Sequence, residues 1–136
     1  MKTIVLISCV SKKLDKKAKA RQLYQSPLFI KSLKYAESLN PDEIYILSAQ
    51  YHLLALDTQI DPYNQTLNEM NKLERNIWGK KVISQLREVA DLNNDNFILL
   101  AGRNYIEPLK SHLKHLNCPL EGMRIGERLQ FLTENI

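Results

Sequence analysis

The chain has 136 residues, of which 44% are hydrophobic and 25% are charged, and its net charge is +4. This composition is typical of one globular domain, and no segment approaches the roughly 18 consecutive apolar residues of a membrane-spanning helix. The two cysteines, Cys9 and Cys118, are too few for a disulfide framework or a cysteine-based zinc site and fit a reducing compartment. We therefore expect a cytoplasmic, monomeric protein with a single α/β domain over residues 1–136, no membrane association, no metal and no other cofactor.

The first half of the sequence predicts two strands joined by a helix. Residues 3–9 form a continuous apolar run with β-branched side chains, which is typical of a strand buried on both faces. Residues 11–21 are polar and basic and indicate a loop. A Ser-Pro pair then begins a helix over residues 26–39, because serine caps a helix and proline suits its first position. Residues 43–51 predict the second strand.

The second half predicts two more strands and three more helices. Residues 52–65 indicate a long connection. Thr66 and Glu69 have the spacing of a capping box, which predicts that a long helix begins at Thr66. Residues 96–102 predict the third strand and residues 118–120 a short fourth strand, each followed by a segment with helical spacing of apolar residues.

Strands that alternate with helices predict βαβ units and a parallel sheet. We therefore expect a three-layer α/β/α domain with a four-stranded, mostly parallel sheet. Ligands of such sheets bind beyond the carboxyl ends of the strands. That rule selects four segments and the loop beside them, namely residues 8–13, 48–57, 102–105, 120–126 and 57–65.

Positive charge is concentrated in the first part of the chain. Residues 1–40 contain nine Lys or Arg and two Asp or Glu, a net charge of +7, whereas residues 41–136 contain ten against thirteen, a net charge of −3. A basic segment on a near-neutral body suits a polyanionic partner. A solvated, lysine-rich loop explains the same pattern.

Small polar and basic residues follow the first strand. Ser8, Cys9 and Lys13 are candidate substrate-binding residues there, because hydroxyl and ammonium groups hold phosphate or carbonyl oxygens. Cys9 is a nucleophile only if the nearby lysines lower its pKa, and the simpler explanation is a small buried residue. The segment lacks the glycine-lysine pattern of a P-loop.

Two aromatic side chains lie at the end of the second predicted strand. Tyr51 or His52 can stack on a base or hydrogen-bond to its edge, and His52 can donate a proton near neutral pH. A lone histidine is also common as a surface residue.

The connection after the second strand contains the candidate catalytic residues, Asp57 and Asp61. Cleavage of a glycosidic bond develops positive charge on the sugar, which a carboxylate stabilises while it orients a water molecule. Tyr63 is a candidate substrate-binding residue beside them. Alternatively, Asp61 and Pro62 form a turn and Tyr63 packs beneath it.

Arginines follow the third strand and the fourth. Arg103 and Asn104 can contact a phosphate or a base edge, and Arg128 lies at the start of the last helix, where an anion is favoured. The alternative is a helix start with solvated arginines.

Six segments spread over nearly the whole chain carry a family resemblance: SCVSKK, LYQSPLF, LSAQYHLL, IDPYNQTL, LAGRNY and PLEGMRIGERL. They resemble, in this order, a family of short bacterial and phage proteins of unknown function. That family is similar to the uracil-DNA glycosylase-like superfamily and to the lysine-bearing domain of archaeal tRNA-guanine transglycosylase relatives. The resemblance implies a parallel four-stranded sheet and a pocket for an extruded base, although Asp61-Pro62-Tyr63 follows the second strand here rather than the first.

We expect from these features a nucleic-acid base N-glycosylase, which cleaves the base-sugar bond of a modified or damaged base and protects against foreign DNA. The expected partner is a nucleic acid, DNA more than tRNA. Three alternatives remain: a 7-deazaguanine-type base-modifying enzyme of tRNA or DNA that uses Lys13, a nucleic-acid-binding module without catalysis, and a hydrolase of free nucleosides.

Overall fold

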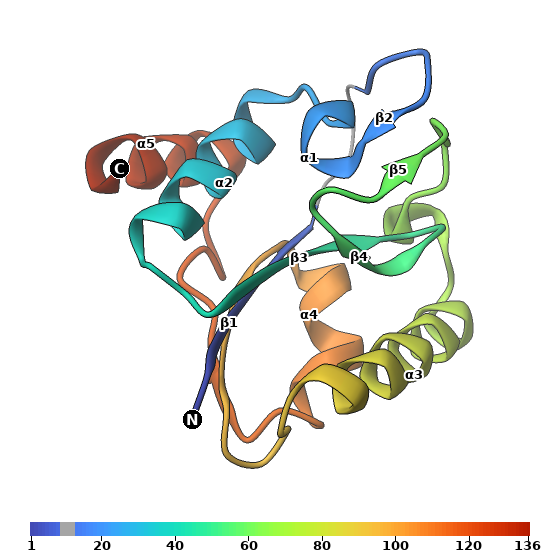
Figure 1. Ribbon diagram of the computed structural model, residues 1–136, viewed down its shortest axis with the longest axis vertical. Helices are drawn as coiled ribbons and strands as arrows, with labels where there is room; N and C mark the ends of the chain where they lie inside the picture. The colour runs from blue at the N-terminus through green and yellow to red at the C-terminus, as the bar shows by residue number, and fades with distance from the viewer. Residues whose placement is uncertain (9–12) are drawn as a thin grey trace.

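A five-stranded sheet lies at the centre of the computed structural model, which describes residues 1–8 and 13–136 (Figure 1). Its strands are β1 (Thr3–Ser8), β3 (Glu43–Ser48), β4 (His52–Ala55), β6 (Asn96–Leu100) and β7 (His115–Asn117). They lie in the order β4-β3-β1-β6-β7, and every neighbouring pair is parallel except β3 with β4. The α/β class and the mostly parallel sheet predicted from the sequence are confirmed.

Helices cover both faces of this sheet. They are α1 (Ala20–Leu23), α2 (Pro27–Ser38), α3 (Lys72–Val89), α4 (Arg103–Lys110) and α5 (Ile125–Asn135). Figure 1 shows α2 and α5 on one side of the sheet and α3 and α4 on the other. A second, two-stranded sheet pairs β2 (Ala18–Lys19) with β5 (Gln59–Ile60). This small sheet and α1 lie beyond the carboxyl end of β1 (Figure 1). None of the helices in the described parts of the chain has the length and apolar character needed to span a membrane.

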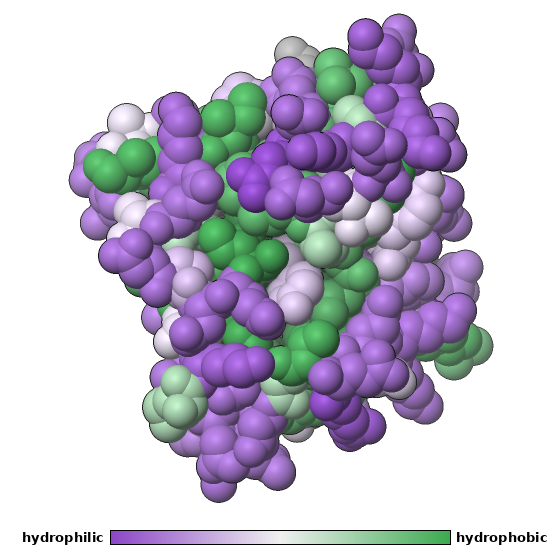
Figure 2. Space-filling model, viewed as in Figure 1, coloured by the Kyte–Doolittle hydropathy of each residue, from purple (hydrophilic) through white to green (hydrophobic). Residues whose placement is uncertain are grey.

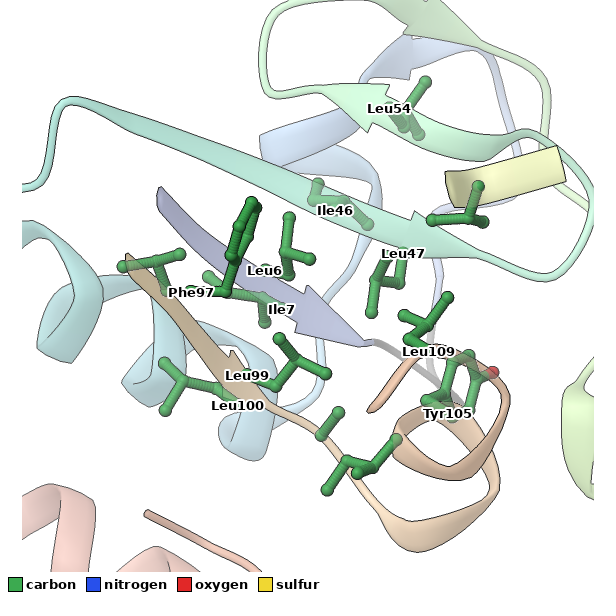
Figure 3. Close-up of a cluster of buried hydrophobic side chains, with 14 of the residues drawn as sticks. Leu6, Ile7, Ile46, Leu47, Leu54, Phe97, Leu99, Leu100, Tyr105 and Leu109 are labelled. Carbon is green, nitrogen blue, oxygen red and sulfur yellow. The ribbon is translucent and has the colours of Figure 1, made fainter. Parts of the chain in front are cut away.

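The core is built around β1. Residues 4–7 of this strand are fully buried, as expected for the central strand of a sheet that is covered on both faces. Figure 3 shows buried side chains of β1, β3 and β6 gathered together, with Tyr105 and Leu109 reaching in from α4. Hydrophilic side chains cover most of the face in view in Figure 2, and apolar ones reach the surface in its middle.

The predicted strand count is wrong by one, because β4 lies in the segment predicted as a connection. β4 pairs antiparallel with β3 through a tight turn, and His52 adopts a positive φ of 64° where the turn ends. Turns of this kind usually contain glycine or asparagine, which adopt positive φ at low cost. Residues 49–52 contain no glycine or asparagine, so no residue type marks this turn and the sequence does not predict the edge strand.

The predicted start of the long helix is also wrong. Thr66 caps only a short 3₁₀ turn, η1 (Leu67–Glu69), and α3 begins at Lys72. The capping box is formed by Asn71 and Glu74, whose side chains each accept a hydrogen bond from the other residue's backbone N–H. Two successive patterns with the same spacing were present, at residues 66–69 and 71–74, and the second one begins the helix.

Smaller differences concern the first loop and the last strand. Residues 11–21, predicted as a loop, include β2 and the start of α1. The last strand, β7, begins three residues earlier than the predicted strand at 118–120. The predicted helix start at Ser26 is confirmed, since its hydroxyl accepts a hydrogen bond from the N–H of Phe29.

The order of the strands creates a switch point between β1 and β6. The chain leaves β1 towards α2 on one face of the sheet, whereas it leaves β6 towards α4 on the other face. Neighbouring strands whose connections diverge leave a crevice between them at their carboxyl ends, which is where open α/β sheets bind ligands.

A buried carboxylate holds the opposite end of the sheet. Asp95, immediately before β6, is 5% exposed and accepts hydrogen bonds from the backbone N–H groups of Lys2 and Asp91, both at 2.8 Å. The hydrogen bond from Lys2, followed by that from Asp91, lowers the pKa of Asp95. The contact joins the starts of β1 and β6.

This contact predicts a pH dependence of stability. Since folding lowers the pKa of Asp95, its contribution is present above the unfolded-state pKa of about 3.9 and is lost as the pH falls towards the folded-state value. We expect the urea concentration at the unfolding midpoint to decrease as the pH is lowered below about 4. This decrease should be less steep in Asp95→Asn, whose side chain cannot titrate. Glu37→Gln, at an exposed site, is the control and should keep the wild-type profile. An identical pH profile for Asp95→Asn and wild type contradicts the prediction.

Candidate functional site

A crevice of about 540 Å³ lies at the carboxyl ends of β1 and β6. Ser8, the last residue of β1, and Gly102, just after β6, lie on opposite sides of the switch point and both line the crevice. The volume is within the range of small-molecule sites. The crevice therefore occupies the position at which this class of sheet binds ligands.

Three helices begin at this crevice. Ser26 caps α2, Gly102 is the residue before α4, and Ile125 is the first residue of α5; all three line the crevice. The first N–H groups of a helix lack partners within the helix and carry partial positive charge. Gly102 supplies no side-chain cap to α4. Ser26 accepts a hydrogen bond from the N–H of Phe29 in α2, and the Glu127 carboxylate accepts one from the N–H of Arg124 before α5. The start of α4, which has no side-chain cap, is therefore the part of the wall that favours an anionic ligand.

Two arginines add full positive charge. Arg103 begins α4, and its side chain is 86% exposed, with Glu107 at 3.9 Å. Arg128, in the second turn of α5, is half-buried, and its Nε donates to the carbonyl of Met123 at 3.0 Å. A Cβ on Gly102 would lie 3.6 Å from the Arg128 guanidinium, which is ordinary van der Waals contact, so this group lies close to the start of α4. The arginines suit phosphate, which their planar groups bind through paired hydrogen bonds.

The remaining wall of the crevice is largely apolar. Leu28, Phe29, Tyr105, Ile125 and Leu129 line it, and Phe29 and Tyr105 are buried. An aromatic and aliphatic wall accepts a planar ring, while the arginines hold a charged group. Asn104 also lines the crevice, and its Nδ2 donates to Oδ1 of Asn68 at 2.7 Å.

A second group of polar side chains lies at the carboxyl end of β3. The hydroxyl of Tyr63 lies 2.6 Å from that of Tyr24 and accepts a hydrogen bond from Ser48 Oγ at 2.9 Å. Ser48 also accepts from the N–H of Tyr51, whose ring meets that of Tyr63 edge-on with centroids 5.6 Å apart. The Nζ of Lys13 lies 4.6 Å from the centroid of the Tyr63 ring, a cation–π contact. This buried network ties the segments that follow β1 and β3 together.

The structure thus divides the predicted binding residues into two groups. Ser8, Arg103, Asn104 and Arg128 come together at the crevice. Lys13, Tyr51 and Tyr63 come together in the tyrosine network. Cys9 lies outside the described residues.

The predicted catalytic aspartates are away from the crevice lining. Asp57 forms an ion pair with Arg21, with Nε 2.9 Å from Oδ1, and its side chain is 64% exposed. Asp61 is exposed, and its backbone carbonyl accepts a 3.3 Å hydrogen bond from the Tyr51 hydroxyl. Both follow β4 on the side of β5, and neither lines the crevice.

His52 lies at the edge of the sheet. It begins β4 opposite Ser48, and its pKa is lowered by burial first and by the charge of Lys81 second. Both effects favour neutral imidazole near pH 7. Among the described residues, no three His, Cys, Asp or Glu side chains are grouped as metal ligands.

Sequence reasoning missed several residues of both groups. Ser26 and Phe29 were interpreted only as a helix start and an apolar position, yet both line the crevice. Tyr24 and Ser48 connect the tyrosine network. Ser48 was detectable, since it lies in the segment 48–57 that the sequence analysis selected, whereas the folding of Tyr24 towards Tyr63 had no local signal.

Comparison with known proteins identifies a family. Residues 4–134 match the model described as "Family of unknown function (DUF6884)". A comparison with curated proteins found no match.

Proposed function

This chain belongs to the DUF6884 family, and from that premise we propose that it is a nucleic-acid base N-glycosylase whose crevice receives one extruded nucleotide. The observation that carries the proposal is the crevice at the β1–β6 switch point, with two arginines and three helix starts around an apolar wall. The resemblance of the sequence to the uracil-DNA glycosylase-like superfamily supports the same function.

The dimensions and chemistry of the crevice suit a nucleotide. A volume of about 540 Å³ accommodates a base with its sugar. Phe29 and Tyr105 belong to the apolar wall, where a base would lie, and Arg103 and Arg128 offer donors to its phosphate. An enzyme that acts on a base within a strand must extrude it into such a pocket.

A basic segment lies at the same end of the sheet. Lys16, Lys17 and Lys19 are exposed, and Lys19 belongs to β2, which lies beyond the carboxyl end of β1 (Figure 1). Lysines here would hold the phosphates of a strand whose nucleotide enters the crevice, which adds salt-dependent affinity. DNA is the proposed strand.

The proposed reaction is hydrolysis of the bond between base and sugar. A carboxylate would stabilise the positive charge that develops on the sugar and orient the attacking water. Of the two aspartates that the sequence suggests, Asp61 is the better candidate, because Asp57 is already paired with Arg21.

A second function, binding of nucleic acid without catalysis, is favoured by one observation. None of the described residues that line the crevice is an aspartate or a glutamate. If no carboxylate reaches the sugar, the crevice holds a nucleotide but leaves its glycosidic bond intact.

Base release separates the two functions. We would incubate the purified chain with a panel of genomic and phage DNAs and measure free bases by mass spectrometry. The N-glycosylase proposal expects a base that is released by wild type and not by Arg128→Ala. Binding of DNA with no base released from any member of the panel overturns the proposal and supports the binding function. Loss of release in Asp61→Asn with retained binding would assign the reaction to that carboxylate.

A further inference from the structure

A second hollow, of about 430 Å³, adjoins the crevice. Arg103 and Arg128 line both hollows, so the two arginines form the boundary between them. Glu107, Glu121, Gly122 and Met123 complete the lining of the second hollow. A phosphate held by these arginines would therefore have a compartment on each side.

The two compartments differ in chemistry. The crevice has an apolar wall, whereas the second hollow has two carboxylates, which accept hydrogen bonds and repel phosphate. Glu107 is held near its place in α4 by Lys110, with Nζ 3.5 Å from its carboxylate. These groups suit a neutral ligand that offers N–H donors.

The position of the second carboxylate is set by a tight turn. The N–H of Glu121 donates to the carbonyl of Cys118, and that of Met123 donates to the carbonyl of Leu120. Gly122 adopts a φ of +81° in this turn, which is unfavourable for other residues. Glu121 and Met123, whose carbonyl accepts the hydrogen bond from Arg128, therefore lie in the same short turn.

We infer that the second hollow is a subsite for the neighbouring nucleotide, so that the substrate is a nucleic-acid strand rather than a free nucleoside. The phosphodiester lies on Arg103 and Arg128, one base occupies the crevice, and the adjacent base offers an amino group to Glu107 or Glu121. This inference rests on the proposed function and adds a subsite that recognises the base beside the extruded nucleotide.

The carboxylates predict a preference for the adjacent base. Cytosine, adenine and guanine carry exocyclic amino groups, whereas thymine carries none. A strand with cytosine beside the extruded nucleotide should therefore bind about fivefold or more tightly than one with thymine there, the lower range of discrimination by a well-placed pair.

The test uses three probes that offer the crevice the same base, thymine. They are thymidine 5′-monophosphate and the DNA trinucleotides CTC and TTT, in which this thymine is central, and each is titrated calorimetrically against the full chain. Wild type should bind CTC more tightly than TTT and both more tightly than the mononucleotide. The double variant Glu107→Ala/Glu121→Ala should reduce the preference for CTC over TTT to less than about twofold. Glu88→Ala, at an exposed site on α3, is the matched control and should keep the wild-type preference.

The outcomes separate this inference from the proposed function. Equal affinity for the mononucleotide and both trinucleotides overturns the second subsite, and so does a preference for CTC that survives in the double variant. Either result leaves base release, measured on the DNA panel, as an independent test of the N-glycosylase proposal. No binding of any of the three probes overturns the subsite and the nucleotide crevice together.

Discussion

Replacing both Arg103 and Arg128 with alanine should lower the affinity for thymidine 5′-monophosphate about 100-fold. A hydrogen bond to a charged group contributes about 1.5–3 kcal/mol, and about 1.4 kcal/mol corresponds to a factor of ten. Arg128 should account for the larger part, because it is half-buried and already held by the carbonyl of Met123. Arg103 is 86% exposed, so solvent screens its contribution.

A graded series separates charge from geometry. Arg128→Lys keeps the charge but loses the planar, paired donors, so its affinity should lie between those of wild type and Arg128→Ala. Arg87→Ala, at an exposed position in the last turn of α3, removes the same charge far from the crevice and is the control. Calorimetric titration measures all four variants, and thermal unfolding shows whether each is folded. A double variant that binds as tightly as wild type would show that the arginines do not hold the phosphate.

These arginines also show what the sequence can predict. The alternation of strands and helices predicts a parallel sheet, and a parallel sheet places the residues after each strand at one edge. Ser8, Arg103 and Asn104 were selected by this rule, Arg128 lies two residues beyond the last selected segment, and the structure brings all four to one crevice. Nothing about their individual spacing was needed, because the topology alone places them together.

The aspartates show where the same rule loses precision. Asp57 and Asp61 also follow a strand that ends at this edge, but the chain between them and β3 makes the β4 hairpin first. That hairpin depends on His52 at φ 64°, a conformation that is uncommon for any residue other than glycine. A connection of unpredicted shape places its residues at unpredicted positions, so the side chains of β5 and its neighbours could not be located from the sequence.

The tyrosine network was unpredictable for a different reason. Tyr24 and Tyr63 are separated by 39 residues and meet through their hydroxyls in the interior. A sequence pattern indicates that each ring is suited to burial, but it does not indicate which ring meets which. Long-range pairing of this kind depends on the packing of α1 and the β5 connection beyond the sheet.

The long helix α3 contains an interior glycine, Gly79, and only the three-dimensional packing of α3 explains why a glycine is needed there. An interior glycine costs about 1 kcal/mol relative to alanine, so a glycine inside a helix calls for a structural reason. In the structure, a Cβ on Gly79 would lie 2.7 Å from Cβ and 2.8 Å from the carbonyl oxygen of Pro108, a buried residue within α4. Gly79 therefore allows α3 and α4 to pack closely, and α4 in turn presents Arg103 to the crevice.

Gly79→Leu should accordingly destabilise the protein by about 3 kcal/mol, the upper range for overpacking, even though leucine favours a helix. Gly79→Ala should also destabilise, by less, because the gain in helix propensity offsets part of the clash. Gly126→Ala is the matched control: a Cβ there meets no atom within 4 Å, so alanine should leave the stability of α5 unchanged or raise it by up to about 1 kcal/mol. Urea unfolding measures the three differences. Because Pro108 is a rigid ring next to backbone, relief requires α4 itself to shift, so the two alanine variants should differ in sign. If Gly79→Ala instead raises stability as Gly126→Ala does, the close packing of α3 on α4 is not what requires the glycine.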